Sequence, residues 1–451
     1  MAPKYAPSLR SRLAPLLLFL QTGFIIISAF FFEIENNINL KKDYFINVYP
    51  AFQDVNVMVI LGFGFFSTFL VRYGLSSSGF NLLVAAMATQ WAIILNGIES
   101  CYTRGKIKVD LKSILVAEMC AASALIAIGP MQGKSSPVQL ILVALMEVSG
   151  FILSEWLLRV LLEVRPLSSI MLLHIFGAFF GLTLTWILYR KGSNQGFEKE
   201  KVDKKSGLFS MLGTVFIWMF WPTFNSVLVD ERYPGRKLEA VCSTYLALAV
   251  SAVTAAALSV FSSPRGKLNL IQIQSCILAG GVAVGVPISV VHHPWEAMAI
   301  GFTAAIISTI GFKYLKIHML LAFECHDTCA VLSTHGLPGL LGWLAHFLLQ
   351  MKDYSDHTLA VRFAMFHICT LCIIISVSLS MGILTGLLLK WNFWRPPQNN
   401  KCFDDQAYWV VRECRDAEML CSYYLERQIH KHVFWTSNFC LLQFPNLAVR
   451  K

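Results

Sequence analysis

Two histidines lie inside strongly apolar stretches of the chain, where an ionisable side chain is unusual. His174 lies in "MLLHIFGAFFG" (171–181) and His335 lies in "STHGLPGLLGW" (333–343). A neutral imidazole carries one lone pair and one N–H, so it can hydrogen-bond a small polar solute. A single histidine inside a span is as often a hydrogen-bonding residue between helices as a functional residue. Two of them favour a functional site.

The elements that carry these histidines follow from the composition. Of the 451 residues, 56% are hydrophobic and 14% are charged, whereas a soluble domain carries roughly 25% charge. The apolar residues form twelve blocks, each near the ~20 residues that cross a bilayer. The sequence therefore predicts an all-α polytopic membrane protein with these spans: Leu13–Phe32, Val55–Val71, Phe80–Gly97, Ile114–Pro130, Pro137–Leu162, Leu167–Leu188, Leu208–Val229, Val241–Phe261, Ile271–Val291, Trp295–Gly311, Cys329–Gln350 and Val361–Leu389.

The topology follows from the number of spans and the basic residues between them. The first block is long enough to be retained as a span, and it lacks the small-residue cleavage site of a signal peptide. An even number of spans places both termini on one side of the membrane. Basic residues are slightly more numerous in the loops on that side, and "YRKGSNQGFEKEKVDKKSG" alone carries six. We therefore expect both termini in the cytoplasm.

The chain divides into two parts. Residues 1-390 contain no linker long enough to separate domains, so we expect one twelve-span domain. Residues 391-451 begin with the polar, proline-broken stretch "WNFWRPPQNNKCFDDQAYW" and are expected to form a cytoplasmic tail. Within that tail, residues 410-442 mix charged, cysteine and aromatic residues without a period, and no structure is predicted for them.

Several function classes are disfavoured by the sequence. The twelve cysteines are scattered, so no disulfide framework and no metal site are predicted. No basic and aromatic module indicates a nucleic-acid partner, and the net charge of +10 fits attraction to membrane lipid. The HExxH, GxSxG and Walker A motifs are absent, so we expect neither an enzyme nor a cofactor.

A weak internal repeat links the two histidines. A glycine follows each histidine by seven residues, at Gly181 and Gly342. The two blocks are the sixth and the eleventh, and this odd offset makes the helices run in opposite directions through the membrane. Inverted repeats of this kind are common in transporters, with the substrate path between the halves. The surrounding glycines are also expected to mark close helix packing.

Five motifs carry a resemblance to a known family: "PAFQDVNVMVILGFG", "HIFGAFFGLTLTWILYR", "MFWPTFNS", "LAGGVAVG" and "DTCAVLSTHGLPG". In order and spacing they resemble the Rh branch of the ammonium transporter family. The absence of an Asn-x-Ser/Thr sequon, with "KCFDDQAYW" and "FPNLAV" near the end, is most similar to the unglycosylated Rh blood-group subunits of the D/CE type. The resemblance implies a homotrimer, or a heterotrimer with an Rh-associated glycoprotein, with one narrow pore in each subunit.

The resemblance also implies roles for particular residues. His174 and His335 match the twin pore histidines of the family, although hydropathy alone predicts His174 near the outer edge of its span and His335 near the inner edge. Phe224, in "WPTFNS", matches one of two phenylalanines that gate the outer mouth. Met119, in "VAEMCAAS", stands where the family has the second. Methionine fills space but has no aromatic face for a cation.

The acidic positions match only in part. Pro166, in "LEVRPLSS", stands where conducting members of the family have an aspartate eight residues before the first pore histidine. Glu163 either compensates or is a solvated loop acid, and we favour the second interpretation. Asp327, eight residues before the second pore histidine, is either the N-cap of its span or a vestibule acid. His292 and His293 are expected to face solvent without binding a metal.

Two functions remain in view at this stage. The first is channel-like passage of ammonia/ammonium, with CO2 as a second solute, through an apolar pore in the plasma membrane. The second is a non-conducting structural subunit of a membrane complex. The tail motif "FDDQAYW" would then contact a cytoskeletal adaptor such as ankyrin. Pro166 and Met119 favour the structural subunit, and the retained histidines favour the channel.

Overall fold

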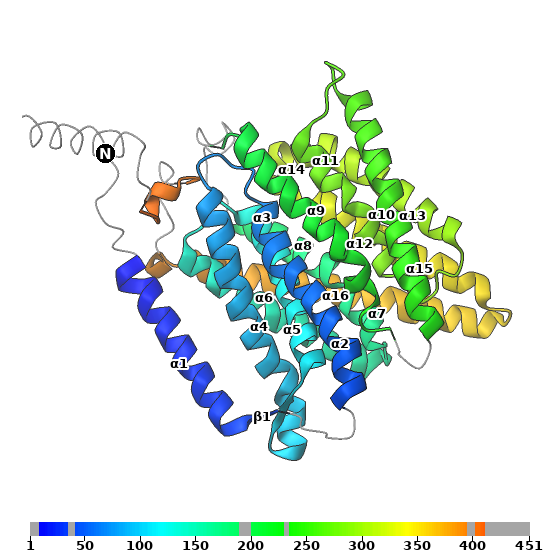
Figure 1. Ribbon diagram of the computed structural model, residues 1–451, viewed down its shortest axis with the longest axis horizontal. Coiled ribbons are helices and arrows are strands. Elements are labelled where there is room, and N and C mark those ends of the chain that lie inside the picture. Colours follow the sequence, from blue (N-terminus) through cyan, green and yellow to red (C-terminus); the bar gives the residue numbers. More distant parts are fainter. Residues whose placement is uncertain (1–8, 35–40, 189–199, 230–233, 395–401, 411–451) are drawn as a thin grey trace, which may run out of the picture.

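The computed structural model is a bundle of helices (Figure 1) and describes residues 9–34, 41–188, 200–229, 234–394 and 402–410. Each of the twelve predicted blocks overlaps a helical segment. Among the described residues, ten helices are long and apolar enough to cross a membrane. The ninth block is a shorter helical segment, Leu270–Gly285, and the eleventh begins with a π-helical turn. The prediction of an all-α polytopic bundle is confirmed.

The elements follow one another along the chain with short connections. Their bounds are α1 (Ala14–Phe31), β1 (Phe32–Ile34), α2 (Lys41–Asn56), η3 (Val57–Gly62), α3 (Phe63–Phe66), α4 (Gly74–Arg104), β2 (Ile107–Val109), α5 (Leu111–Ile128), α6 (Pro137–Leu162), α7 (Pro166–Ile170), α8 (Leu173–Ile187), α9 (Lys204–Ser226), α10 (Pro234–Ser262), α11 (Leu270–Ile277), α12 (Ala279–Gly285), α13 (Pro294–Ile310), η6 (Gly311–Leu315), α14 (Lys316–Phe323), η7 (Leu332–Gly336), α15 (Leu337–Asp353), α16 (His357–Leu389) and η10 (Asp405–Ala407).

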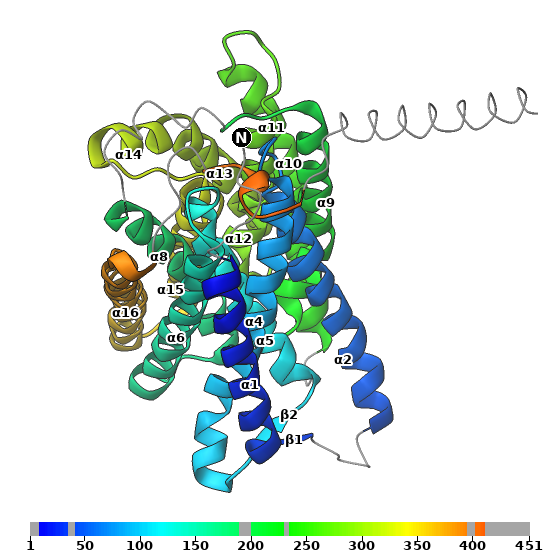
Figure 2. The same ribbon diagram turned by 90° about the vertical axis from the view of Figure 1, so that its left-hand side faces the viewer.

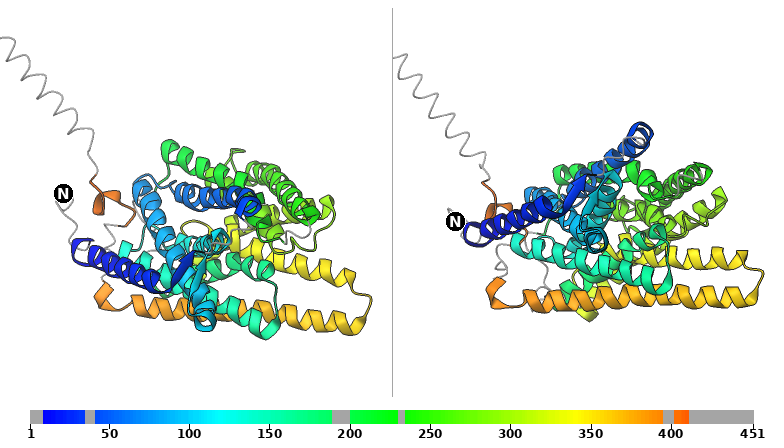
Figure 3. Two further views of the ribbon diagram at one scale, coloured as in Figure 1. Left: turned by 60° about the horizontal axis from the view of Figure 1, so that its bottom comes forward. Right: turned by 90° about the horizontal axis from the view of Figure 1, so that it is seen from below.

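The centre and the edge of the bundle differ sharply in burial. The apolar stretches of α5 and of the α7–α8 segment are 89% and 83% buried, whereas that of α1 is only 6% buried. Figure 2 shows α1 lying along the flank of the bundle. There Phe24 stacks on Trp91 with ring centroids 6.0 Å apart, and Gln21 hydrogen-bonds Gln90. At the opposite edge α15 and α16 run side by side and extend beyond the other helices (Figure 3).

Two close helix crossings repeat at an offset of five spans. In the first half α8 packs on α5, and in the second half α15 packs on α12. A Cβ added at Gly181 would overlap the backbone carbonyl of Ala127, and one added at Gly342 would overlap that of Ala283. Glycine at each crossing lets the two backbones touch. These are the two glycines that follow the histidines, so their spacing reports helix packing.

Both histidine-bearing segments are interrupted. The short helix α7 ends at Ile170, and α8 begins at Leu173 without a side-chain N-cap. In the second half, residues 324–330 are not helical and include a turn at 328–329, yet 325–331 are buried. Ala330 has φ 55°, a left-handed conformation that is unusual for a residue with a side chain. Each interruption starts a new helix inside the bundle, one turn or less before a histidine.

The described part of the tail docks onto the bundle. The Asp405 carboxylate accepts hydrogen bonds from the backbone N–H groups of Leu75 (2.9 Å) and Ser76 (2.7 Å), at the first turn of α4. Phe403 is fully buried and its backbone N–H donates to the Gly133 carbonyl at 2.8 Å. Gly133 has φ 80°, and a Cβ there would overlap the Phe403 ring. The tail thus caps α4 and covers the 129–136 loop, while residues 411–451 lie outside the described residues.

We predict that Asp405→Ala lowers the stability of the protein, because it leaves the first amides of α4 without their acceptor. The expected loss is about 1 kcal/mol, measured as a lower melting temperature in detergent. Asp405→Asn keeps one side-chain oxygen acceptor and should lose less. Equal melting temperatures for the alanine variant and the unmodified protein would show that the tail does not cap α4.

Candidate functional site

His174 and His335 lie against each other in the centre of the bundle. Their ring centroids are 5.2 Å apart and their planes differ by 16°. Both side chains are buried, with 1% and 3% of their surface exposed. The expectation from hydropathy that they lie at different depths is wrong. Both α8 and η7 begin inside the bundle, and each histidine lies in the first turn of its helix. Both side chains therefore lie at the centre.

Aromatic rings complete the walls around this histidine pair. Trp221 stacks on the His174 ring at 5.7 Å, and Phe224 lies 6.3 Å from it. Phe63 stacks on His335 at 6.2 Å. Trp221 and Phe224 are one helical turn apart on α9, so they face the same side. The sequence analysis identified Phe224 and missed Trp221, which lies in the same "WPTFNS" motif.

Three of the four ring nitrogens of this pair have no hydrogen-bond partner among the described residues. Both ring nitrogens of His174, Nδ1 of His335 and the indole Nε1 of Trp221 are buried and have no hydrogen bond among the described residues. Buried polar groups are usually hydrogen-bonded, and each exception calls for an explanation. A small solute with both a lone pair and N–H groups would satisfy them. The geometry therefore favours an uncharged polar solute, since moving an ion from water into this apolar site is costly in free energy.

The proposed gate residues are both fully buried. Phe224 and Met119 each have 0% of their surface exposed and belong to the same hydrophobic core. Phe224 also meets Trp221 edge-on, with ring centroids 6.4 Å apart. The gating role of this pair stays a prediction.

A cavity of about 760 Å³ opens beside Pro166, at the start of α7. Leu228, one turn beyond Phe224, and Ile170, just before α8, also line it. The cavity therefore lies at the same end of the histidine site as Phe224. Its wall contains Glu155, which accepts a hydrogen bond from Ser169 at 3.1 Å.

Glu155 is an acid that the sequence analysis overlooked. It lies inside an apolar block, and an ionisable residue in such a block is a functional candidate by position alone. Glu163 is exposed and has φ 52° at the end of α6, which matches the solvated loop acid. The cavity also holds the ion pair Glu99–Arg159 at 2.6 Å, with both side chains more than half exposed.

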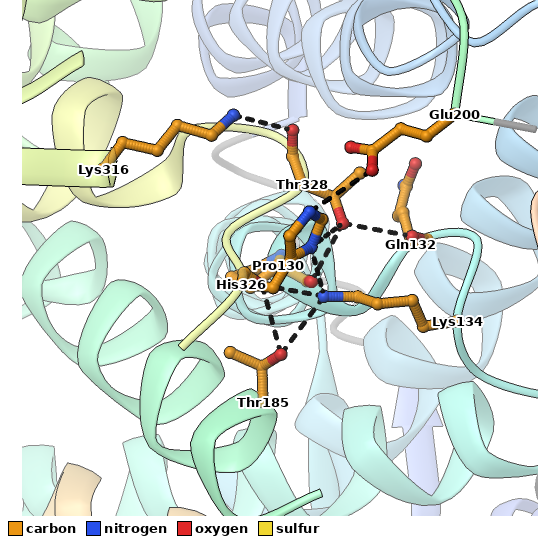
Figure 4. Close-up of polar contacts among 8 residues, drawn as sticks. All are labelled: Pro130, Gln132, Lys134, Thr185, Glu200, Lys316, His326 and Thr328. Atoms are coloured by element: carbon orange, nitrogen blue, oxygen red, sulfur yellow. Dashed lines mark hydrogen bonds and ion pairs between the residues drawn. The ribbon is translucent and has the colours of Figure 1, made fainter. Parts of the chain in front are cut away.

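At the opposite end of the histidine site, a polar cluster joins three connecting segments (Figure 4). The Lys134 ammonium donates to the His326 carbonyl (2.7 Å), to His326 Nδ1 (2.9 Å) and to Thr185 Oγ1 (3.2 Å). His326 Nε2 lies 3.3 Å from a Glu200 carboxylate oxygen. Thr328 Oγ1 donates to the Pro130 carbonyl at 3.1 Å. The cluster ties the loops before α6, α9 and η7 together.

The partners of His326 define its tautomer. Since Nδ1 accepts from Lys134, the ring proton lies on Nε2 and is donated to Glu200. Burial and the Lys134 charge lower the pKa of His326, although the hydrogen bond to Glu200 acts in the opposite direction and raises it. Burial also lowers the pKa of Lys134 to about 8. For Glu200, burial opposes the shift, but the His326 hydrogen bond and nearby lysines bring its pKa below the ordinary value.

Asp327 follows His326 and turns toward the next helix. Its two carboxylate oxygens accept from the backbone N–H groups of Val331 and Leu332, each at 3.0 Å. This geometry matches the helix-cap interpretation, although the first helical residue is Leu332 rather than Cys329. Asp327 also lines a cavity of about 410 Å³ with His326 and Lys316, so a vestibule role remains a proposal.

The remaining candidate ligands do not gather into a site. His292 and His293 are exposed, and His292 Nδ1 lies against the Arg236 guanidinium at 2.5 Å. Cys369 and Cys372 have a C-x-x-C spacing but are free and exposed on α16. Within the described residues, no three His, Cys, Asp or Glu side chains come together as a metal site would require.

Comparison with known proteins gives relatives along almost the whole chain. The Ammonium Transporter Family profile matches residues 14–395. The chain is 38% identical over 399 residues to ammonium transporter Rh type C of Canis lupus familiaris, covering 84% of this chain and 86% of that protein. It is 37% identical over 409 residues to ammonium transporter Rh type A of Bos taurus, covering 88% and 94%.

Solved structures share the fold. Nitrosomonas europaea Rh50, described as a member of the Rhesus protein family of channels, superposes with a TM-score of 0.71 at 26% identity, over 87% of this chain and 99% of that chain. Candida albicans Mep2 superposes with a TM-score of 0.62 at 17% identity, over 78% and 85%. At that identity the second likeness concerns the fold alone.

We predict that mild acid destabilises the polar cluster through His326. Its lowered pKa keeps the folded imidazole neutral in a range where the unfolded one is protonated. The folded state therefore loses stability as the pH falls below about 6.5, until the folded imidazole is protonated as well. Protonation would also replace the Lys134 hydrogen bond with a repulsion.

The measurement is the melting temperature in detergent between about pH 7.5 and pH 5.5. His326→Gln serves as the matched variant, because the amide can accept from Lys134 and donate to Glu200 without titrating. Its melting temperature should fall less over this range than that of the unmodified protein. An identical fall in both proteins would contradict the assignment.

Proposed function

The chain belongs to the Rh-type branch of the ammonium transporter family, and from this premise we propose that it lets ammonia or ammonium cross the membrane through the site built by His174 and His335. The observation that carries the proposal is the set of buried ring nitrogens without hydrogen-bond partners. Ammonia has one lone pair and three N–H groups, so it can accept from one imidazole N–H and donate to another ring nitrogen.

The two mouths supply complementary steps. The outer cavity holds Glu155 and the Glu99–Arg159 ion pair, so an ammonium ion can be attracted there while still hydrated. Transfer of its proton to water in the outer cavity, before Phe224, removes the cost of bringing an ion into the apolar centre. Past the histidines, the solute meets the polar side chains around His326 and Asp327, where it can take up a proton from water.

Finer points of identity and assembly belong to the same proposal. The absence of a glycosylation sequon and the motif "KCFDDQAYW" support the D/CE-type subgroup, whereas the relatives compared above are of types C and A. We place the protein in the plasma membrane with both termini cytoplasmic. It would act as a trimer, alone or with an Rh-associated glycoprotein, and CO2 would be a second neutral solute for the same apolar path.

A structural subunit is the second candidate function, and two features favour it. Pro166 has no carboxylate with which to attract a cation at the outer mouth, and Met119 gives the gate only one aromatic ring. In such a subunit the tail would bind a cytoskeletal adaptor such as ankyrin. Phe403 and Asp405 of the tail motif are engaged with the bundle, so an adaptor would contact the residues that remain exposed.

We predict that the protein, reconstituted alone in proteoliposomes, speeds internal alkalinisation after an ammonium jump. His174→Ala with His335→Ala should alter or abolish the effect, because the solute loses its hydrogen-bond partners. The control is His292→Ala with His293→Ala, which changes two exposed histidines away from the pore. A trace like that of empty vesicles, from protein shown to be folded and inserted, would favour the structural subunit.

We further predict that Glu155→Gln raises the ammonium concentration that gives half-maximal flux. Removing a carboxylate from the outer cavity lowers the local cation concentration, roughly threefold or more at low salt. The difference should shrink as ionic strength rises. The matched control is Glu163→Gln, an exposed acid near the same end of α6, which should leave the flux unchanged. The opposite pattern, with Glu163→Gln alone reducing flux, would assign the recruiting role to Glu163.

A further inference from the structure

A buried carboxyl group on α6 has no role in the pore as described so far. Glu147 has 0% of its surface exposed. One of its oxygens contacts the Ser123 hydroxyl on α5, and the other has no hydrogen-bond partner. Among the described residues no cation forms an ion pair with it. An ionised carboxylate in this apolar place, with a single hydrogen bond, would be costly.

The Ser123 hydroxyl lies between two oxygen atoms. On one side is the Glu147 carboxyl group, and on the other is the backbone carbonyl of Leu173, at 3.1 Å. A hydroxyl has one hydrogen and can donate it to only one of them. Both contacts are hydrogen bonds only if the second hydrogen comes from the acid. The protonated carboxyl then donates to Ser123, and Ser123 donates to Leu173.

The carbonyl at the end of this chain belongs to the residue before His174. Leu173 is the first residue of α8, and α8 has no side-chain N-cap. A Cβ at Gly177 would lie 2.6 Å from the Ser123 carbonyl oxygen, so α5 and α8 touch at this level. Another serine, Ser378 on α16, donates to the Phe176 carbonyl at 2.8 Å. Side-chain hydroxyls thus hold the first turn of α8 from two sides.

The histidine itself depends on this support. Neither ring nitrogen of His174 has a hydrogen bond within the described structure, so nothing polar fixes the imidazole directly. Its position is set by its backbone and by stacking on Trp221 and His335. A shift of Leu173 would therefore move the ring relative to its partner. The spacing between the two histidine rings would then change, even though no residue that lines the site had been replaced.

We propose that Glu147, as a neutral carboxylic acid, donates a hydrogen bond to Ser123, which donates to the Leu173 carbonyl, and that this chain is a positioning device for His174. The proposal rests on the function proposed above for the histidine pair. Glu147 does not touch the solute and is not part of the pore wall. Its proton stays in place during passage, so the device works at constant charge.

The first test is flux in proteoliposomes. Glu147→Gln keeps a donor toward Ser123 and should conduct within about twofold of the unmodified protein. Glu147→Leu and Ser123→Ala break the chain and should each reduce flux about tenfold or more. The double variant should be no worse than the more severe single variant, because both act through one chain. A Gln variant as poor as the Leu variant would overturn the proposal, since it would show that the carboxyl itself is needed.

The second test reads the proton without transport. The infrared difference between the unmodified protein and Glu147→Gln should contain the C=O band of a protonated carboxylic acid at neutral pH. Glu118→Gln is the matched control, because Glu118 is a buried acid on α5 outside this chain. A carboxylate band instead would overturn the proposal. This readout decides it even if the unmodified protein does not conduct, a result that would count against the proposed function alone.

Discussion

The site depends on the close approach of helix backbones at two glycines. Gly181 lies over the Ala127 carbonyl and Gly342 over the Ala283 carbonyl, and a larger residue at either place would push the helices apart. His174 lies in α8, and His335 lies in η7, directly before α15. The same crossings therefore bring both histidines to the centre of the bundle. The position of the histidine pair is thus set by packing between helices.

Interrupted helices are the second condition for this site. A continuous span would keep all its backbone groups bonded within itself and would carry its histidine on a helix surface. Here α8 starts in the interior after a short break, and η7 starts after a buried non-helical stretch capped by Asp327. At the second break the Asp327 carboxylate accepts from the Val331 and Leu332 amides, and the His326 carbonyl accepts from Lys134 and Thr185. Irregular backbone at this depth is typical of places where a solute passes.

Much of the fold could be predicted because hydropathy is a strong signal in long apolar helices. All twelve blocks overlap helical segments, and the glycines seven residues after each histidine do mark close crossings between backbones. The depth of the histidines could not be predicted, because hydropathy does not report breaks inside a span. Trp221 was missed since a tryptophan in an apolar block carries no signal of its own, whereas Glu147 and Glu155 could have been flagged as acids within spans.

The docking of Asp405 on α4 joins two segments that are synthesised at different times. The amides that it caps belong to Leu75 and Ser76, 330 and 329 residues earlier. While the chain is being made, α4 enters the bundle with its first turn lacking this acceptor, and it obtains one only when almost the whole protein has been synthesised. A chain that stops before residue 403 would leave those amides uncapped and Gly133 uncovered. The first turn of α4 therefore obtains its full set of hydrogen bonds only after the chain has reached residue 405.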